Sequence, residues 1–170
     1  MLLLHTCCAV CAAGCIERLL ADKREVRLFF SNSNLDTPEE FERRLASVRD
    51  FAAIFKLEFE VDPYDHSGWL DTVAGLEREP EKGARCTVCF GRALAHTARR
   101  AQELDATFAT TLTVSPHKRS AMIFEVGAAW RNFEPIDFKK QNGFGRSLAL
   151  SAEYGFYRQN YCGCEFSRTN

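Results

Sequence analysis

The chain lacks the common motifs of nucleotide binding and of serine-type hydrolysis. It contains no G-x-x-x-x-G-K-[ST] phosphate loop, no G-x-G-x-x-G after a predicted strand, and no G-x-S-x-G elbow. The pair Gly143 and Gly145 is too short a match to count as a glycine-rich loop. A nucleotide cofactor held by a standard motif is therefore not expected.

Membrane spans, export signals and low-complexity linkers are also missing from the sequence. No apolar run approaches the roughly 20 residues of a membrane span, and residues 1–4 give way at once to His5 and cysteines rather than continuing as a leader. We therefore expect a cytoplasmic protein with no membrane partner. At 170 residues, 46% of them hydrophobic and 26% charged, the chain is expected to form one domain, residues 1–170.

The net charge is only −1, but it is unevenly distributed. Residues 1–109 hold 14 Lys and Arg against 18 Asp and Glu, whereas residues 110–170 hold 8 against 5. The C-terminal third could present a modestly basic face to an anionic partner. A mixed, solvated surface explains the same counts equally simply.

Cysteine is the residue type that stands out. There are eight: Cys7, Cys8, Cys11, Cys15, Cys86, Cys89, Cys162 and Cys164. The even number would suit disulfides, but the chain is too large for a disulfide scaffold and carries no export signal. Clustered thiols in a reducing compartment more often bind metal or carry out redox chemistry, which is the interpretation we favour.

The first thiol cluster lies at a strand-to-helix turn. Residues 5–11 (HTCCAVC) follow the apolar strand of residues 1–4 and precede a helix predicted over residues 12–22. In an open α/β fold such turns lie at the carboxyl ends of the strands, where ligands usually bind. Adjacent cysteines cannot easily pair with each other. They can both reach one polynuclear metal centre.

The second cluster, Cys86-x-x-Cys89, opens a predicted helix. The helix dipole and the free N–H groups there are expected to lower the thiol pKa and favour the metal-binding thiolate. With Cys7 and Cys8 it supplies the four ligands of a [4Fe–4S] cluster. The same four thiolates suit a tetrahedral zinc ion. We favour the cluster, because a vicinal pair reaches separated irons more easily than one small ion.

The third cluster is Cys162-Gly163-Cys164. A disulfide across so short a loop would be strained, whereas the intervening glycine lets two ligands converge. Cys11 is the natural companion, which suggests a second metal site beside the first. Cys15, one helical turn after Cys11, is expected to be a small buried side chain.

Strands and helices alternate along the chain in the manner of βαβ units, which predicts a mostly parallel sheet. Strands are predicted over residues 1–4, 26–30, 57–61, 107–113 and 133–138, and helices over residues 12–22, 37–56, 66–76, 86–104 and 119–130. Thr37, Pro38 and Glu40 form a strong helix start with a capping box. Residues 139–170 are expected to be irregular but ordered, folding back over the sheet edge.

Taken together, these residues resemble the QueH family of cobalamin-independent epoxyqueuosine reductases. The resemblance runs nearly end to end, through residues 5–11, 85–90 (RCTVCF), 110–118 (TTLTVSPHK), 137–140 (DFKK), Gly143, 146–147 (RS), 150–151 (LS) and 157–167 (YRQNYCGCEFS). The family pattern usually has Pro where this chain has Val10, which affects loop stiffness rather than a ligand. The resemblance implies a three-layer Rossmann-like α/β fold of the nucleotide-binding α-hydrolase (HUP) type, with about five mostly parallel strands and an ordered C-terminal segment carrying Cys-Gly-Cys.

The resemblance also implies the activity, cofactors and partners. The chain would reduce epoxyqueuosine to queuosine at the wobble position of tRNA, the last step of queuosine biosynthesis, with electrons from an external donor. Likeness assigns Cys7, Cys8, Cys86 and Cys89 to a [4Fe–4S] cluster, and Cys11, Cys162 and Cys164 to a second mononuclear metal, expected to be iron. In this interpretation the second metal polarises the epoxide oxygen, with His117 as a candidate proton donor.

Substrate contacts are expected from the polar C-terminal motifs, namely Lys118, Arg146, Tyr157, Arg158, Gln159 and Asn160. Basic members would contact phosphates and tyrosines would stack on the splayed base. Two alternatives remain open. One is a zinc-stabilised RNA-binding module without redox chemistry, and the other is a thiol–disulfide oxidoreductase using Cys86 and Cys89.

Overall fold

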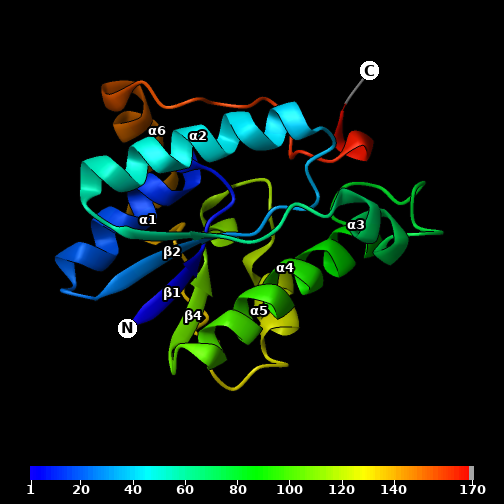
Figure 1. The fold of residues 1–170 in the computed structure, drawn as a ribbon, viewed down its shortest axis with the longest axis horizontal. Helices are drawn as coiled ribbons and strands as arrows, with labels where there is room; N and C mark the ends of the chain where they lie inside the picture. The colour runs from blue at the N-terminus through cyan, green and yellow to red at the C-terminus, as the bar shows by residue number, and fades with distance from the viewer. Residues whose placement is uncertain (169–170) are drawn as a thin grey trace.

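The computed structural model describes residues 1–168 and shows an α/β fold. Four parallel strands form a sheet in the order β3-β2-β1-β4 (Figure 1). The α-helices and strands are β1 (Leu2–His5), α1 (Ala9–Ala21), β2 (Val26–Phe30), α2 (Pro38–Phe55), β3 (Glu58–Val61), α3 (His66–Thr72), α4 (Ala84–Glu103), β4 (Thr107–Thr110), α5 (Ser120–Gly127) and α6 (Gly143–Tyr154), with short 3₁₀ turns η1 (Thr111–Val114), η2 (Lys140–Asn142) and η3 (Glu165–Ser167). The fold class predicted from the sequence is confirmed.

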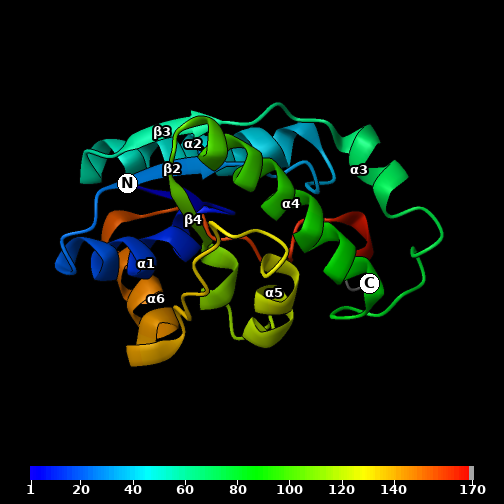
Figure 2. The ribbon, with the colours of Figure 1, turned by 90° about the horizontal axis from the view of Figure 1, so that it is seen from below.

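The sheet is covered on both faces, as the apolar character of its strands requires. Successive side chains of β1 point to opposite sides: Leu2 and Leu4 belong to the core under α1 and α2, whereas Leu3 packs with Phe90 and Leu94 of α4. Figure 2 shows α1 and α6 side by side on one side of the molecule, with α4 and α5 on the other. These helices and the sheet between them form the three layers that the resemblance implied.

The start of α2 follows the predicted cap only in part. The Thr37 hydroxyl accepts a hydrogen bond from the Glu40 N–H at 3.1 Å, and Pro38 occupies the first turn, as expected. The Glu40 carboxylate does not complete a capping box. It is buried and accepts from the Arg44 guanidinium at 2.7 Å and from the Tyr157 hydroxyl. The Glu40 carboxylate therefore binds Arg44 and Tyr157 rather than the backbone N–H of Thr37.

The fifth strand predicted over residues 133–138 is wrong. That segment contacts the sheet through one isolated bridge, Phe108 with Phe133, and two backbone hydrogen bonds. Pro135 has no N–H to donate, and so cannot extend a ladder. The strand at 107–113 is also shorter than predicted, because η1 begins at Thr111. The described sheet thus has four strands rather than five.

Helix α6 was not predicted, because residues 139–170 were expected to be irregular. Gly143 and Gly145 give its first turn a poor helix propensity. The helix forms against α1, where a Cβ added at Gly14 would lie 2.6 Å from the Gly143 carbonyl oxygen. The Gly14 N–H donates to the Ser147 hydroxyl at 3.1 Å. Packing at this close crossing decides the structure, rather than local preference.

Residues 155–168, which follow α6, pack against the rest of the fold. After α6 the chain (orange to red) runs back along α2 towards α3 (Figure 1). The Tyr157 N–H donates to Ser47 on α2, and the Asp36 N–H donates to the Gly163 carbonyl. No helix within residues 1–168 is long and apolar enough to cross a membrane.

Candidate metal centre

A cavity of about 400 Å³ opens at the carboxyl end of the sheet. In the sheet, β1 lies between β2 and β4, so the strands that follow β1 in sequence are placed on both sides of it. The carboxyl end of β1 is therefore a topological switch point, the place at which open α/β sheets bind ligands. Four thiols from three distant segments line the cavity: Cys7, Cys11, Cys89 and Cys162. The cysteines of all three sequence clusters therefore meet at one place.

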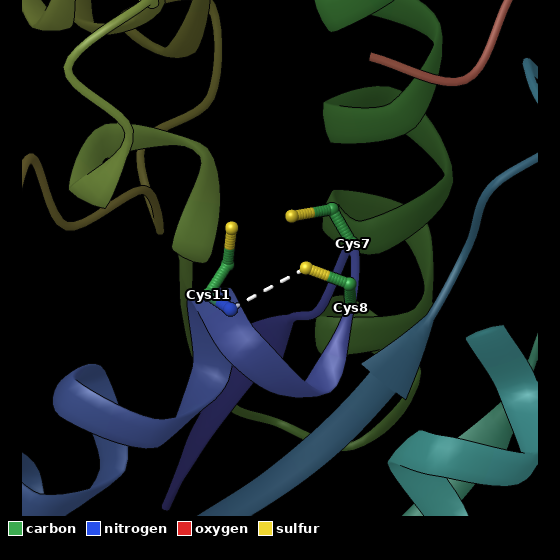
Figure 3. Close-up of side chains that lie close together, drawn as sticks. All are labelled: Cys7, Cys8 and Cys11. Carbon is green, nitrogen blue, oxygen red and sulfur yellow. Dashed lines mark hydrogen bonds between the residues drawn. The ribbon is translucent and has the colours of Figure 1, made fainter. Parts of the chain in front are cut away.

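The turn after β1 holds the tightest group of thiols. The Sγ atoms of Cys7, Cys8 and Cys11 all lie within 4.8 Å of one another. Figure 3 shows the sulfurs of Cys7 and Cys8 pointing towards that of Cys11. Cys8 is the N-cap of α1, and its sulfur accepts from the Cys11 N–H at 3.3 Å. The capping geometry thus fixes the position of the trio.

The three thiols do not ionise alike. Hydrogen bonds from Cys11 and Cys7 hold the pKa of Cys8 well below its ordinary value of 9.0. The same contacts, with Cys7 and Cys8 as acceptors, raise the pKa of Cys11 well above that value. Cys8 is therefore the first of the trio to become a thiolate, the form that binds metal.

Cys86 and Cys89 lie in the first turns of α4, which begins at Ala84. Cys86 Sγ accepts from the Lys82 N–H at 3.3 Å, and Cys89 Sγ accepts from the indole N–H of Trp69 at 3.4 Å. Burial raises the pKa of both thiols, that of Cys89 to about 12. The lowering expected from the helix N-terminus is therefore outweighed by desolvation.

The Cys-Gly-Cys cluster reaches the cavity through Cys162. Gly163 has a φ of +129°, and a Cβ there would lie 2.4 Å from a methyl of Leu35, so the glycine is needed for both conformation and space. Cys164 is buried in a small apolar group with Trp69, against which Cys89 also packs. Cys15 is buried and donates its S–H to the Cys11 carbonyl, as its expected structural role requires.

His5 fixes the strand ends beneath the thiols. Its ring is buried, 1% exposed, with Nε2 3.0 Å from the Ser31 carbonyl oxygen and Nδ1 2.8 Å from the Thr110 hydroxyl. Because a carbonyl can only accept, Nε2 carries the proton and Nδ1 accepts from Thr110. Burial lowers the pKa of His5, which keeps the ring neutral. One imidazole thus ties together the ends of β1, β2 and β4.

The predicted substrate residues divide into two sets. Those that line the cavity are Lys118, Arg158, Gln159 and Asn160, and the candidate proton donor His117 lines it with them. Arg146 instead forms a bidentate pair with Glu17 on the surface, and Tyr157 donates to Glu40 beneath the stacked guanidinium of Arg43. Neither of these two lines the cavity, and a role for them in substrate binding stays a prediction.

Sequence reasoning missed Arg44 and the asparagines of the cavity. Arg44 is 2% exposed and donates to the Cys162 carbonyl at 3.0 Å. Asn32 and Asn34 line the cavity, and the Asn32 amide also donates to the Thr6 carbonyl. The polar run of residues 31–34 after a buried strand is a signal from which the asparagines could have been found. An arginine in a helix gives no local sign that its side chain is buried.

The donor set suits a thiolate-bound metal group. All eight cysteines are free, and Cys86 joins Cys162 in a small recess beside the main cavity. Six sulfurs thus lie in or beside one space: those of Cys7, Cys8, Cys11, Cys86, Cys89 and Cys162. Soft sulfur ligands in this number favour zinc or iron–sulfur groups over hard cations.

Comparison with known proteins gives one consistent family. The family model described as epoxyqueuosine reductase QueH matches residues 2–170. The chain is 38% identical to the epoxyqueuosine reductase QueH of Streptococcus pyogenes serotype M1, over 98% of this chain and 69% of that protein. It is 34% identical to the Staphylococcus epidermidis protein of the same name (98% and 75% covered), and 32% identical to that of Thermotoga maritima (97% and 88%).

Proposed function

This chain belongs to the QueH family of epoxyqueuosine reductases, which are oxidoreductases, and we propose that it converts epoxyqueuosine to queuosine in the anticodon of tRNA, the last step of queuosine biosynthesis. The observation that carries the proposal is the meeting of thiols from three distant segments at one cavity. A redox centre is what the reaction requires, and thiols are what such a centre binds.

The reaction determines how many electrons and protons the site must receive. Reducing the epoxide to the cyclopentene takes two electrons and two protons and releases the oxygen as water. An external electron donor must supply the electrons, because each turnover consumes two and the protein has to be reduced again before the next. In this proposal residues 1–170 act as one catalytic domain in the cytoplasm, and the donor meets it there.

We assign the thiols to two groups. Cys7, Cys8, Cys86 and Cys89 would hold a [4Fe–4S] cluster, and Cys11, Cys162 and Cys164 a second metal, iron. When bound, the cluster supplies electrons one at a time and the iron acts as a Lewis acid towards oxygen. In support, Cys7 and Cys86 border the same apolar cluster. Cys11 also lies within 4.8 Å of Cys7 and Cys8, close enough to share a metal group with them. The variants described below test whether Cys11 binds the cluster or the second metal.

The cavity also suits the substrate. Its volume of about 400 Å³ is within the range of small-molecule sites, and it admits a base splayed out of the anticodon loop. Gln159, Asn160 and Asn34 place amides on its wall, able to read the edge of a base. His117 and Arg158 are exposed at its rim, where they can meet phosphate or donate a proton.

The proposal is tested by metal content and activity together. The protein is purified without oxygen, reconstituted with iron and sulfide, and assayed for iron, sulfide and zinc per chain. About four sulfides with four or five irons are expected, in line with four thiolate ligands. Conversion of epoxyqueuosine in tRNA, with dithionite as the electron source, is followed by mass spectrometry of the released nucleosides.

Three cysteine variants test which thiols bind the cluster and which bind the second metal. Cys7→Ala should lose iron and sulfide together, whereas Cys11→Ala should keep the sulfide and lose only the fifth iron. Cys15→Ala is the matched control, because that thiol is buried in α1 away from the cavity, and it should retain both. Zinc without sulfide after reconstitution would contradict the reductase and favour an RNA-binding module stabilised by zinc.

A further inference from the structure

Lys118 is half-buried in the wall of the thiol cavity. It follows η1 and lines the cavity together with Cys7, Cys11 and Cys162, and it also borders the recess that contains Cys86. Its backbone is fixed on both sides, because its N–H donates to the Ser115 carbonyl and its carbonyl accepts from Lys139. The turn that places Lys118 on the cavity wall is therefore well anchored.

The ammonium of Lys118 has no acidic partner. Within residues 1–168 no carboxylate pairs with its Nζ, whereas several arginines of the chain pair with Glu or Asp. Glu81 lines the same cavity but is exposed and makes no ion pair with Lys118. The residues that line the cavity and the recess with Lys118 include Cys7, Cys11, Cys86 and Cys162. A lysine without a carboxylate partner therefore shares its surroundings with sulfur.

We propose that Lys118 is the electrostatic counter-charge of the thiol-bound centre, stabilising its more negative, reduced state, rather than a contact to the tRNA backbone. Sulfur ligands and an added electron both place negative charge in the cavity, and a cation in the wall stabilises that charge most strongly where water is excluded. This inference rests on the proposed function, because it presupposes an iron–sulfur group at these cysteines.

The alternative role, a phosphate contact, would place the ammonium towards solvent. Arg158 and Arg119 are exposed and reach the same rim without burial, so they serve that role at lower desolvation cost. The two roles predict different defects. Loss of a counter-charge alters the centre itself, whereas loss of a phosphate contact alters RNA affinity and its dependence on salt.

The experiment compares wild type, Lys118→Met, Lys118→Arg and Lys23→Met, all reconstituted without oxygen. Lys23→Met is the control, since it removes the same charge from an exposed residue at the far end of α1. Iron and sulfide per chain and the midpoint reduction potential are measured by chemical analysis and spectroelectrochemistry. Binding of an unmodified anticodon stem-loop to the unreconstituted chain is measured in parallel.

Lys118→Met should shift the midpoint potential to more negative values or lose the cluster, while Lys118→Arg and Lys23→Met stay close to wild type. Stem-loop affinity of Lys118→Met should change by less than about threefold, since no phosphate contact is lost. An unchanged potential in a fully loaded Lys118→Met, cluster loss in both Lys118 variants, or a defect in RNA affinity alone would overturn the inference. Failure of wild type to bind iron and sulfide would instead refute the proposed function.

Discussion

The guanidinium of Arg44 donates a hydrogen bond to the carbonyl oxygen of Cys162 at 3.0 Å, and this contact joins α2 to the C-terminal segment. The same guanidinium pairs with Glu40 at 2.7 Å, and its plane lies near the ring of Tyr161. A residue 118 positions away in sequence thus fixes the backbone of a thiol in the cavity.

Replacing Arg44 should therefore cost both stability and metal. Arg44→Gln removes the closest cation from buried Glu40, which keeps only the Tyr157 hydroxyl and the more distant Arg43, and it leaves the Cys162 carbonyl without its donor. We expect the free energy of unfolding, measured by urea denaturation, to fall by about 3 kcal/mol. The double variant with Glu40→Gln should recover part of the loss, because the buried carboxylate that lost its main partner is also removed.

The control for Arg44 lies on the same helix. Arg49 is exposed and forms no ion pair among the described residues, so Arg49→Gln should change stability by no more than about 0.5 kcal/mol. Equal effects at the two arginines would show that the contact to Cys162 and Glu40 contributes little.

Gly163→Ala should disturb the segment that carries Cys162. The φ of +129° and the 2.4 Å approach to Leu35 both oppose a Cβ, so the segment has to shift, at a cost of about 1–3 kcal/mol, and iron content should fall. Gly155→Ala is a matched control. It also has positive φ, +69°, but open space around it, and should cost about 1 kcal/mol with iron unchanged.

Acid should destabilise the protein partly through Glu60 on β3. The hydrogen bond from Arg100 lowers the pKa of Glu60 below its ordinary 4.5, against the opposing effect of burial, and Arg27 adds to the lowering. Its contribution is thus full above pH 4.5 and is lost as pH falls through the lowered pKa. Glu60→Gln should be less stable at pH 7 by at most about 1 kcal/mol. Its stability should also fall less steeply between pH 5 and 3.

Urea unfolding at several pH values, in reducing buffer, measures that difference. Arg100→Met should reproduce the shallower dependence on pH, because it removes the donor that lowers the pKa of Glu60. An acid dependence identical in wild type and Glu60→Gln would assign the effect to other carboxylates.

Trp69 should report on metal at Cys89. Its indole, 1% exposed, donates to Cys89 Sγ at 3.4 Å, so a visible-absorbing centre bound to that sulfur lies within quenching range. The chain has two tryptophans, and Trp130→Phe isolates Trp69. Its fluorescence should fall on reconstitution in this background and should not recover until the metal is removed. Unchanged emission in a fully loaded protein would exclude Cys89 as a ligand.

The sequence predicted four of the strands and the turn that carries the first thiols, because both depend on local pattern. β2 was predicted with its observed bounds, and the thiols after β1 were expected at the carboxyl edge where the cavity lies. Short apolar runs and turn chemistry carry this information within a few positions. The cap at Thr37 is confirmed for the same reason.

What failed depends on partners distant in sequence. Helix α6 begins with glycines, and it forms because α1 packs closely against it at Gly14. A short stretch of sequence around α6 does not reveal this contact. Residues 133–138 read as a strand, yet Pro135 and the single bridge at Phe133 limit them to a short edge contact. Whether Glu40 caps its helix or pairs with Arg44 is likewise settled by the fold.

The C-terminal segment that brings Cys162 to the cavity has a consequence for biosynthesis. Cys7, Cys8 and Cys11 leave the ribosome first, but the wall that completes their cavity is translated about 150 residues later. Until the Cys-Gly-Cys segment has been made and has packed against α2, the early thiols lack Cys162 as a neighbour. The metal proposed to bind across these segments therefore requires the finished fold rather than the nascent chain.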